Sequence, residues 1–458
     1  MTWRRTMAGL ALPLALALAG GACHDEEPPP AEDPDCSLDD DAGCLDGRVC
    51  EEVVGGTVGC FDPVTVTGTV FDTADAAPVE GARVVVQDAN GAAVSGVAET
   101  DADGAYSVAV PAPRNPDGTL AADTRYTLRA DAAGYLTFPR PPREAIPLDV
   151  SGLTGADLVV ENATTDVGLI ALPSAADLGA ISGRVTGEDP GGTFVVAGGS
   201  SAVADADGSF TVFNVPAGTV TVQAYRLGAN YAPETVDVEA GETTGDVVLA
   251  AGNAATAVVS GDVNVVNPGD GDLTSVILVA EETFDETTLT GEAPPGFRAG
   301  DVSNSWSIAG VPDGDYVALA AFGNDDLVRD PDTSIGGTEI QHLTVAGGDV
   351  SVTGFKVTGA LAVISPGADG AEAVSGAPVT LTWEDDSSED SYEVVVYDAL
   401  GDLVWEATAL DPGGSAPVTA EFPGPLEPGM YYQFRVTSIK DGVPISSTED
   451  LKGVFFAE

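Results

Sequence analysis

From about residue 64 onward, apolar and polar positions alternate along short segments that end at Gly, Asp or Pro. Residues 209–224, SFTVFNVPAGTVTVQA, show the pattern well, because two alternating segments flank a V-P-x-G turn. A period of two places the apolar side chains of a strand on one face, and regular turn residues keep each strand short. No helical period of useful length follows the first 22 residues. The pattern predicts an all-β chain of tandem β-sandwiches.

The same pattern recurs along the chain. Residues 305–320, SWSIAGVPDGDYVALA, align with residues 209–224 without a gap. Each copy follows a Ser-Gly strand, ISGRV from Ile181 and VSGDV from Val259. The later copy also carries an insertion over residues 281–302. Repetition of one strand-turn-strand unit predicts repeated sandwiches of one kind.

A further segment of this class begins at Val64 and contains P-V-x-G-A-x-V, then T-D-x-D-G-x-Y, then A-x-G-Y. This order resembles carboxypeptidase regulatory-like domains, which have a prealbumin-like fold and often serve as accessory or spacer modules. The resemblance implies one such sandwich over 64–172, a second over 178–252 and a third, divergent one over 254–358. It does not imply peptidase activity. The residues that carry the match are Gly68, Pro78, Val79, Gly81, Ala82, Thr100, Asp101, Asp103, Gly104, Tyr106, Gly134 and Tyr135.

The C-terminal segment, 360–458, differs in character and resembles a fibronectin type III domain. The resemblance makes Trp383 the core tryptophan. It also implies that the phenol of Tyr432 forms a hydrogen bond back to the main chain, as in a tyrosine corner. The L-x-P-G-x-x-Y motif of that corner consists of Leu426, Pro428, Gly429 and Tyr432.

The N-terminal segment has the order of a secretory signal over residues 1–22: two arginines, then an apolar stretch with small residues at its end. The stretch is too short for a span of about 20 residues. Cleavage before Cys23 would resemble processing of a bacterial lipoprotein, which implies an acylated Cys23 that ties the chain to the membrane. Gly20 stands where that family usually has Leu, and plain cleavage is the alternative. We therefore expect export to the outer membrane or cell surface, with a periplasmic or secreted protein as the alternative.

Residues 23–35 are rich in acidic residues and proline, so they predict an extended tether. The next segment, 36–60, holds four cysteines, Cys36, Cys44, Cys50 and Cys60. An even number in an exported chain predicts two disulfides, with three possible connectivities. A zinc site would need cysteine pairs spaced more closely than these. The segment is therefore expected to be a small disulfide module.

The chain has 73 acidic and 17 basic residues, a formal net charge of −56. A field of this sign repels nucleic acid and anionic headgroups, so neither is an expected partner. Calcium is the one cofactor that the sequence suggests, at the D-x-D-G stretches of Asp101 and Asp103 and of Asp205 and Asp207. Both stretches lack the later Glu and the helices of an EF-hand, and both fit hairpin turns closed by glycine. A related hypothesis is that carboxylates of adjacent sandwiches converge on calcium.

Candidate catalytic residues are scarce. The two histidines, His24 and His342, lie in the tether and on an expected strand, and no metalloprotease, nucleophile-elbow or P-loop motif is present. We expect no enzyme, but a structural or adhesion scaffold of the cell envelope, whose partners would be surface polysaccharide or envelope proteins. The alternative is an array of carbohydrate-binding modules, which needs exposed aromatic rings. Trp306 and Tyr316 are expected in the core, while the candidates for exposure are Tyr225, Tyr231 and Phe297.

Overall fold

The structure, a computed structural model, is nearly all β, which confirms the predicted fold class of tandem β-sandwiches. Its helical elements, in the described part of the chain, are three short 3-10 turns. The predicted signal segment, Cys23 and the tether lie outside this part. No helix within it is long and apolar enough to cross a membrane. The structure describes residues 36, 38, 44, 48–122, 124–154, 158–265, 273–286, 288–320, 327–329, 340–386, 389–411 and 417–458.

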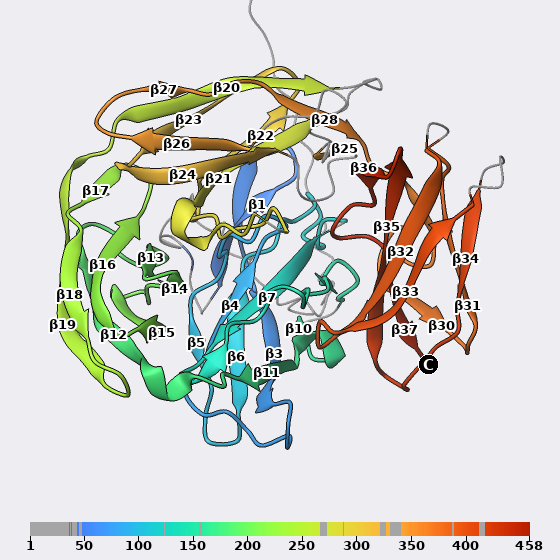
Figure 1. Cartoon of the computed structure of the whole chain (residues 1–458), viewed down its shortest axis with the longest axis horizontal. Coiled ribbons are helices and arrows are strands. Elements are labelled where there is room, and N and C mark those ends of the chain that lie inside the picture. Colours follow the sequence, from blue (N-terminus) through green and yellow to red (C-terminus); the bar gives the residue numbers. More distant parts are fainter. Residues whose placement is uncertain are drawn as a thin grey trace, which may run out of the picture.

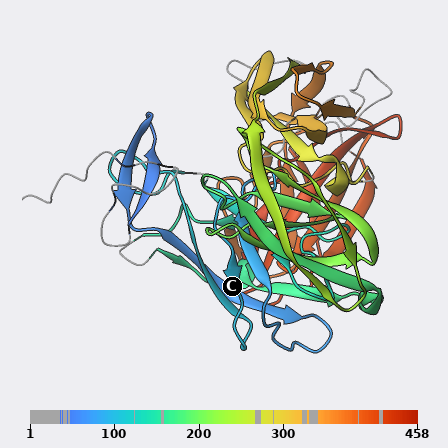
Figure 2. The same cartoon turned by 90° about the vertical axis from the view of Figure 1, so that its left-hand side faces the viewer.

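An antiparallel hairpin of β1 (Val49–Val53) and β2 (Thr57–Phe61) precedes the first sandwich. It places Cys50 directly opposite Cys60. Figure 2 shows this hairpin standing out from the body of the molecule, beside the start of the first sandwich.

Sandwich 1 extends from β3 to β11. In one sheet β3 lies between β6 on one side and β10 and β11 on the other, with β8 beyond β11, and the second sheet has the order β5-β4-β7-β9. The bounds are β3 (Val64–Asp72), β4 (Arg83–Gln87), β5 (Ala98–Glu99), β6 (Ala105–Val110), β7 (Arg125–Asp131), β8 (Tyr135–Leu136), β9 (Leu148–Asp149), β10 (Val159–Val160), η1 (Ala163–Thr165) and β11 (Val167–Ala171).

Sandwich 2 extends from β12 to β19 and consists of the sheets β15-β12-β19-β17 and β14-β13-β16-β18. A short turn, η2 (Ala175–Asp177), precedes it. The bounds are β12 (Leu178–Thr186), β13 (Phe194–Ala197), β14 (Ser200–Val203), β15 (Ser209–Pro216), β16 (Gly218–Tyr225), β17 (Ala229–Tyr231), β18 (Glu234–Val238) and β19 (Thr243–Ala254).

Sandwich 3 extends from β20 to β28 and consists of the sheets β23-β20-β28-β25, with β27 beside β20, and β22-β21-β24-β26. The bounds are β20 (Ala257–Val265), β21 (Thr274–Ala280), η3 (Glu281–Thr283), β22 (Arg298–Val302), β23 (Ser305–Val311), β24 (Gly314–Ala320), β25 (Leu327–Arg329), β26 (Gln341–Val345), β27 (Val350–Ser351) and β28 (Phe355–Gly359).

The three sandwiches share one topology. In each sandwich the first strand (β3, β12 or β20) pairs antiparallel with a later strand (β6, β15 or β23). It also pairs parallel with the last strand (β11, β19 or β28). The second sheets also correspond strand for strand, including that of the divergent third copy. The repeat read from two segments of sequence therefore extends over three complete sandwiches.

One glycine in each first strand faces an aromatic ring across the sheet: Gly68 faces Tyr106, Gly183 faces Phe210 and Gly261 faces Trp306. A Cβ on Gly183 would lie 2.2 Å from the carbonyl oxygen of Val247 on the last strand and 2.7 Å from the Phe210 ring. No side chain fits there. The glycine of the Ser-Gly motif is thus required by the close approach of the last strand and the ring.

Replacing Gly183 with alanine should lower the free energy of unfolding by about 1–3 kcal/mol, because the added methyl group forces the two strands apart. Denaturant unfolding of the variant measures the change. Gly152→Ala is the matched control, since a Cβ at Gly152 would meet no atom within 4 Å. Equal stability of the two variants would contradict the steric explanation.

Sandwich 4 is formed by the sheets β29-β31-β34 and β30-β37-β35-β32-β33, with β36 beside β35. Trp383 is fully buried, and the phenol oxygen of Tyr432 accepts a hydrogen bond of 2.9 Å from the backbone N–H of Glu427. The bounds are β29 (Val363–Ser365), β30 (Glu372–Val374), β31 (Val379–Trp383), β32 (Ser391–Asp398), β33 (Leu403–Leu410), β34 (Val418–Phe422), β35 (Tyr431–Lys440), β36 (Val443–Ser447) and β37 (Val454–Ala457).

The sandwiches pack against one another and do not form a linear string of separate domains. In Figure 1 sandwich 1 lies at the centre, sandwich 2 and sandwich 3 curve around one side of it, and sandwich 4 packs on the other. The strands β4, β13 and β21 are buried at every position, so neighbouring sandwiches cover the outer faces of their sheets. One hydrophobic cluster contains Val85 of sandwich 1, Phe194 and Tyr225 of sandwich 2, and Tyr316 of sandwich 3.

Candidate functional site

A pocket of about 400 Å³ opens where the four sandwiches meet. Sandwich 1 contributes β7 and the loop over residues 137–145, and sandwich 2 contributes residues 199–201. Residues 282–285, Thr288 and 290–292 of the sandwich 3 insertion form a further wall, and sandwich 4 contributes Arg435, Asp450 and Leu451. This volume lies within the range of small-molecule sites. The pocket is formed between sandwiches, so no single sandwich contains it.

Three sandwiches converge on one arginine at this pocket. Arg129 of β7 lies with its Nε 2.9 Å from Glu292 Oε2 of sandwich 3, and its Nη2 donates to Ser201 Oγ of sandwich 2 over 2.9 Å. Ser201 Oγ in turn donates to Glu292 Oε1 over 2.7 Å. Asp131 Oδ1 lies 3.1 Å from Arg129 Nη1. We call these four residues the Arg129 node.

The electrostatics of the node follow from its burial, since Arg129 and Asp131 are each 2% exposed. Burial by itself would lower the pKa of Arg129, but Glu292 and Asp131 outweigh it, and the pKa is raised. Burial raises the pKa of Asp131 in spite of its arginine neighbours. The charge of Arg129 is therefore held in place by carboxylates from two sandwiches.

A second joint connects sandwich 1 to sandwich 2. Arg83 Nη2 lies 3.1 Å from Asp205 Oδ1 and donates to the carbonyl oxygen of Val203 over 3.2 Å. The Asn214 side chain accepts from Gly134 N over 2.7 Å and donates to the carbonyl oxygens of Ala132 and Tyr135. Asp205, a calcium candidate from the sequence, thus forms an ion pair between sandwiches.

Sandwich 4 is attached through two more arginines. Arg143 packs over the Phe138 ring at 4.9 Å, donates to the carbonyl oxygen of Leu400 and lies 3.2 Å from Asp402 Oδ1. Burial lowers the pKa of Arg143. The junctions between sandwiches therefore bring arginine against carboxylate, rather than carboxylates against one another as a shared calcium site would require.

Arg435 extends the same joint from sandwich 4. Its Nη1 lies 3.5 Å from Glu144 Oε2 and 3.4 Å from Asp450 Oδ1. Burial would lower the pKa of Arg435, but Glu144 and Asp450 raise it further than burial lowers it. Burial also raises the pKa of Glu144. The pair is thus partly removed from solvent.

The disulfide module is fixed to sandwich 1 by a buried pair. Glu51 of β1 is 1% exposed and contacts Arg114 Nε with one carboxylate oxygen, while its other oxygen accepts from Ala112 N over 3.0 Å. Arg114 also lies over the Phe61 ring at 5.0 Å and donates to the carbonyl oxygen of Asp62 over 2.8 Å. The hairpin is therefore part of the folded body.

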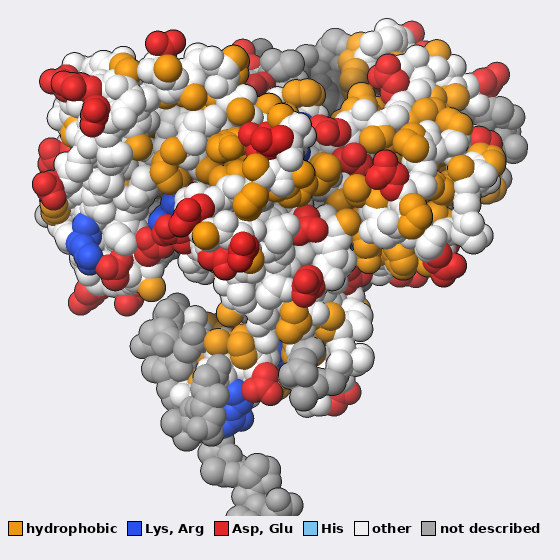
Figure 3. Space-filling model, turned by 90° about the horizontal axis from the view of Figure 1, so that it is seen from below, with side chains coloured by type: hydrophobic (Ala, Val, Ile, Leu, Met, Phe, Trp, Pro, Cys, Tyr) orange, Lys and Arg blue, Asp and Glu red, His pale blue; other side chains and the backbone are white. Residues whose placement is uncertain are grey.

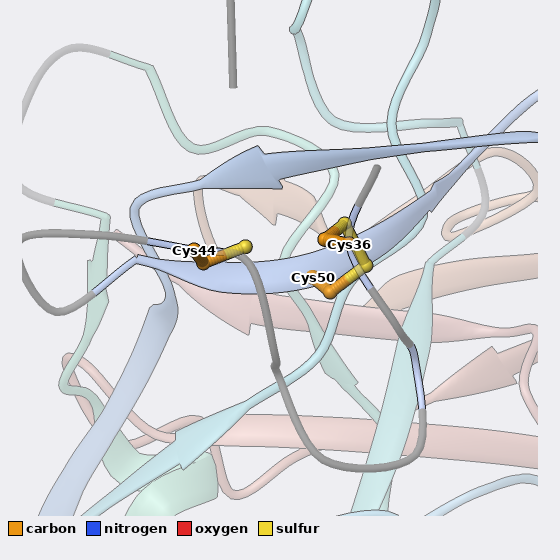
Figure 4. Close-up of side chains that lie close together, drawn as sticks. All are labelled: Cys36, Cys44 and Cys50. Carbon is orange, nitrogen blue, oxygen red and sulfur yellow. A yellow bond between two sulfur atoms is a disulfide. The ribbon is translucent and has the colours of Figure 1, made fainter. Parts of the chain in front are cut away.

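The cysteines form the disulfides Cys36–Cys50 and Cys44–Cys60, which selects one of the three predicted connectivities. Figure 4 shows the first of these bonds with the Cys44 side chain beside it. The sulfurs of Cys36, Cys44 and Cys50 lie within 4.8 Å of one another, the one grouping of three potential metal ligands in the part of the chain that the structure describes. All three sulfurs are already bonded, so they do not fit a metal site.

The D-x-D-G stretches form turns. Asp101 Oδ1 accepts from the backbone N–H groups of Asp103 and Ala105, and the following Gly104 has a φ of 74°. Asp207 Oδ1 accepts from Ser209 N over 2.9 Å, and these Ser209 hydrogen bonds lower its pKa to about 2. Asp103, at the tip of its turn, is exposed. Asp101 and Asp207 therefore stabilise the hairpin turns in which they lie.

The aromatic rings proposed for exposure are in fact buried, which corrects that prediction. Tyr225 and Tyr231 are each 5% exposed and Phe297 is 1% exposed. Tyr225 packs edge-on against Tyr316 at 5.5 Å, so it seals the contact between two sandwiches. Trp306 and Tyr316 are buried, as predicted. Tyr231 lies in the core of sandwich 2 itself, and Phe297 packs against Tyr316 of its own sandwich. Only the contact of Tyr225 with Tyr316 depends on how the sandwiches are arranged, which the sequence pattern does not show.

The burial of several arginines was also not predicted from the sequence. Fourteen of the 17 basic residues are arginine, and five of the arginines in the described part of the chain are buried, namely Arg83, Arg114, Arg125, Arg129 and Arg143. Figure 3 shows the consequence, because red acidic side chains lie all over the visible face and blue basic ones are few. The excess of arginine over lysine was the available signal, since arginine suits buried ion pairs better than lysine does.

No family model matches the chain, and no curated protein matches it. Among solved structures it is similar to the TIE protein of Bacillus anthracis, at 10% identity over 89% of this chain and 72% of that one, with a TM-score of 0.15. A DUF3823 family protein of Bacteroides ovatus matches at 15% identity over 43% and 98%, with a TM-score of 0.22. Two B repeat units of the Staphylococcus aureus collagen binding protein match at 12% identity over 83% and 94%, with a TM-score of 0.18. At TM-scores this low, neither an arrangement nor an activity is transferred from these structures.

Proposed function

We propose that the chain is an exported scaffold of the bacterial cell envelope, with a structural or adhesive role rather than a catalytic one. The observation that supports this function is the Arg129 node, which joins three sandwiches through a buried network. Buried pairs of this kind fix the orientation of the domains that share them. A body of fixed shape is what a spacer or a display platform needs.

The attachment would be at the N-terminal end. Acylation of Cys23 would tie the chain to the outer membrane, residues 23–35 would hold it away from the surface, and the Glu51–Arg114 pair would set the angle at which the body leaves the tether. Several acyl chains give stable anchoring, since each buried CH₂ contributes about 0.8 kcal/mol. The partners would be surface polysaccharide or envelope proteins, and the net charge of −56 disfavours nucleic acid.

The family assignment belongs to the same proposal. The shared topology of sandwiches 1 to 3 supports three carboxypeptidase regulatory-like modules. The buried Trp383 and the hydrogen bond to Tyr432 support a fibronectin type III-like module at the C-terminal end. Carboxypeptidase regulatory-like modules often serve as spacers, which agrees with the scaffold role.

The proposal predicts that cells producing the full chain incorporate a palmitate analogue into it and expose a C-terminal epitope tag to antibody on intact cells. Cys23→Ser should lose the label and leave the membrane fraction, because no acyl chain remains. Cys44→Ser, which removes a disulfide cysteine instead, is the control and should keep the label. Absence of label on the parent chain would rule out the anchor. A tag accessible only after cell lysis would rule out surface display.

A further inference from the structure

The pocket between the sandwiches is lined by four arginines, and three of them are already paired. Arg129 is held by Glu292 and Asp131, Arg143 lies against Asp402, and Arg435 lies against Glu144. The fourth, Arg140, is exposed and lines the pocket between Pro139 and Pro141. Within the described residues, no hydrogen bond or ion pair involves its guanidinium. The pocket therefore presents one open cationic donor group.

The loop that carries Arg140 is held on both sides. The backbone N–H of Arg143 donates to the Arg140 carbonyl oxygen over 3.0 Å, and Glu144 N donates to Gly401 O of sandwich 4 over 3.1 Å. Two flanking prolines further restrict the backbone. The backbone of Arg140 is therefore held in position, which reduces the conformational entropy that the loop would lose when a ligand binds.

The rest of the lining is rich in hydroxyl groups. Thr127 comes from sandwich 1 and Ser200 from sandwich 2, while Thr288 and Thr290 of the sandwich 3 insertion lie with their hydroxyl oxygens 2.8 Å apart. The exposed carboxylate of Glu282 lies on the same insertion. Hydroxyls and carboxylates accept hydrogen bonds from ligand hydroxyl groups. The insertion seen in the sequence thus supplies one wall of the pocket.

We propose that this pocket binds a small polyhydroxylated carboxylate of the uronic-acid type. The carboxylate pairs with the guanidinium of Arg140, and the ligand hydroxyls bind to Thr288, Thr290 and Glu282. The charge of the chain and the burial of its aromatic rings argue against two other classes of ligand. A multiply charged phosphate is repelled by the acidic field of the chain, and a neutral sugar would need the exposed aromatic platform that Tyr225, Tyr231 and Phe297 do not provide.

The test is isothermal titration of galacturonic acid, which carries a single carboxylate, into the full chain purified in detergent. We expect saturable binding with one site per chain, weakened about ten-fold or more in Arg140→Ala, since a charge-assisted hydrogen bond is worth at least that factor. The methyl ester of galacturonic acid keeps the ring hydroxyls and lacks the charge, so the parent chain should bind it as weakly as Arg140→Ala binds the acid. Arg184→Ala, at an exposed arginine outside the pocket, should leave the affinity unchanged.

A parent chain that does not bind galacturonic acid overturns the proposal, as does equal affinity of the parent and Arg140→Ala. Equal binding of acid and ester would show that hydroxyls alone are recognised, which also overturns it. Thr288→Val with Thr290→Val is a second variant and should weaken binding without touching Arg140. The scaffold function does not depend on these outcomes, because anchoring and display are measured separately on cells.

Discussion

Arg129→Met is expected to lower the free energy of unfolding by about 3–5 kcal/mol, because it leaves buried carboxylates without their cation. Asp131 is 2% exposed, and Glu292 would lose its contact to sandwich 1. Methionine keeps much of the side-chain volume, so the loss reports the charge rather than a cavity. Urea unfolding followed by circular dichroism measures it.

The position of the sandwiches should change in the same variant. With the node removed, sandwich 1 would no longer be tied to Glu292 and Ser201, and small-angle X-ray scattering should show a larger radius of gyration. Arg184→Met is the matched control, since it breaks an exposed pair with Asp207 at 2.7 Å. Exposed pairs contribute about 0–1 kcal/mol, so the control should lose little. A similar small loss in both variants would show that the node does not hold the sandwiches together.

The fold class was predictable because it depends on local rules. Alternation, turn residues and the repeated V-P-x-G turn define strands and their ends, and the glycine opposite Phe210 marks a close strand contact that any copy must keep. Even the burial of Trp306 followed from its position on an alternating strand. These features concern residues that meet within one sandwich.

The candidate site was not predictable, because it is formed between sandwiches. Arg129, Ser201 and Glu292 are separated by up to 163 residues and share no motif. The same is true of Arg140 and Thr288. The apolar runs VVV of β4 and VILV of β21 did indicate strands buried on both faces, but only the packed structure shows which neighbours cover them. The aspartates at the turns drew attention through their spacing. Asp101 and Asp207 stabilise their own turns, whereas Asp205 pairs with Arg83 of sandwich 1.

The second large effect is expected where the disulfide module meets sandwich 1. There Arg114→Met should also lower the free energy of unfolding by about 3–5 kcal/mol. It leaves the carboxylate of Glu51, 1% exposed, without its partner and removes the contact with the Phe61 ring. The backbone hydrogen bonds of Arg114 to Glu52 O and from Val54 N remain. The decrease in the free energy of unfolding would therefore report the loss of the side-chain ion pair and not of backbone hydrogen bonds.

The double variant Glu51→Gln with Arg114→Met separates pairing from packing. Glutamine removes the buried charge and can still accept the hydrogen bond from Ala112 N, so the double variant should be more stable than Arg114→Met alone. Hydrogen exchange gives the local measurement. In Arg114→Met the amides of β1 and β2 should exchange faster, because the contact of the hairpin with sandwich 1 is weakened, while those of β31 and β35, which belong to sandwich 4, should not. If the two single replacements prove additive, Glu51 and Arg114 are not coupled, and the hairpin is held by its backbone contacts instead.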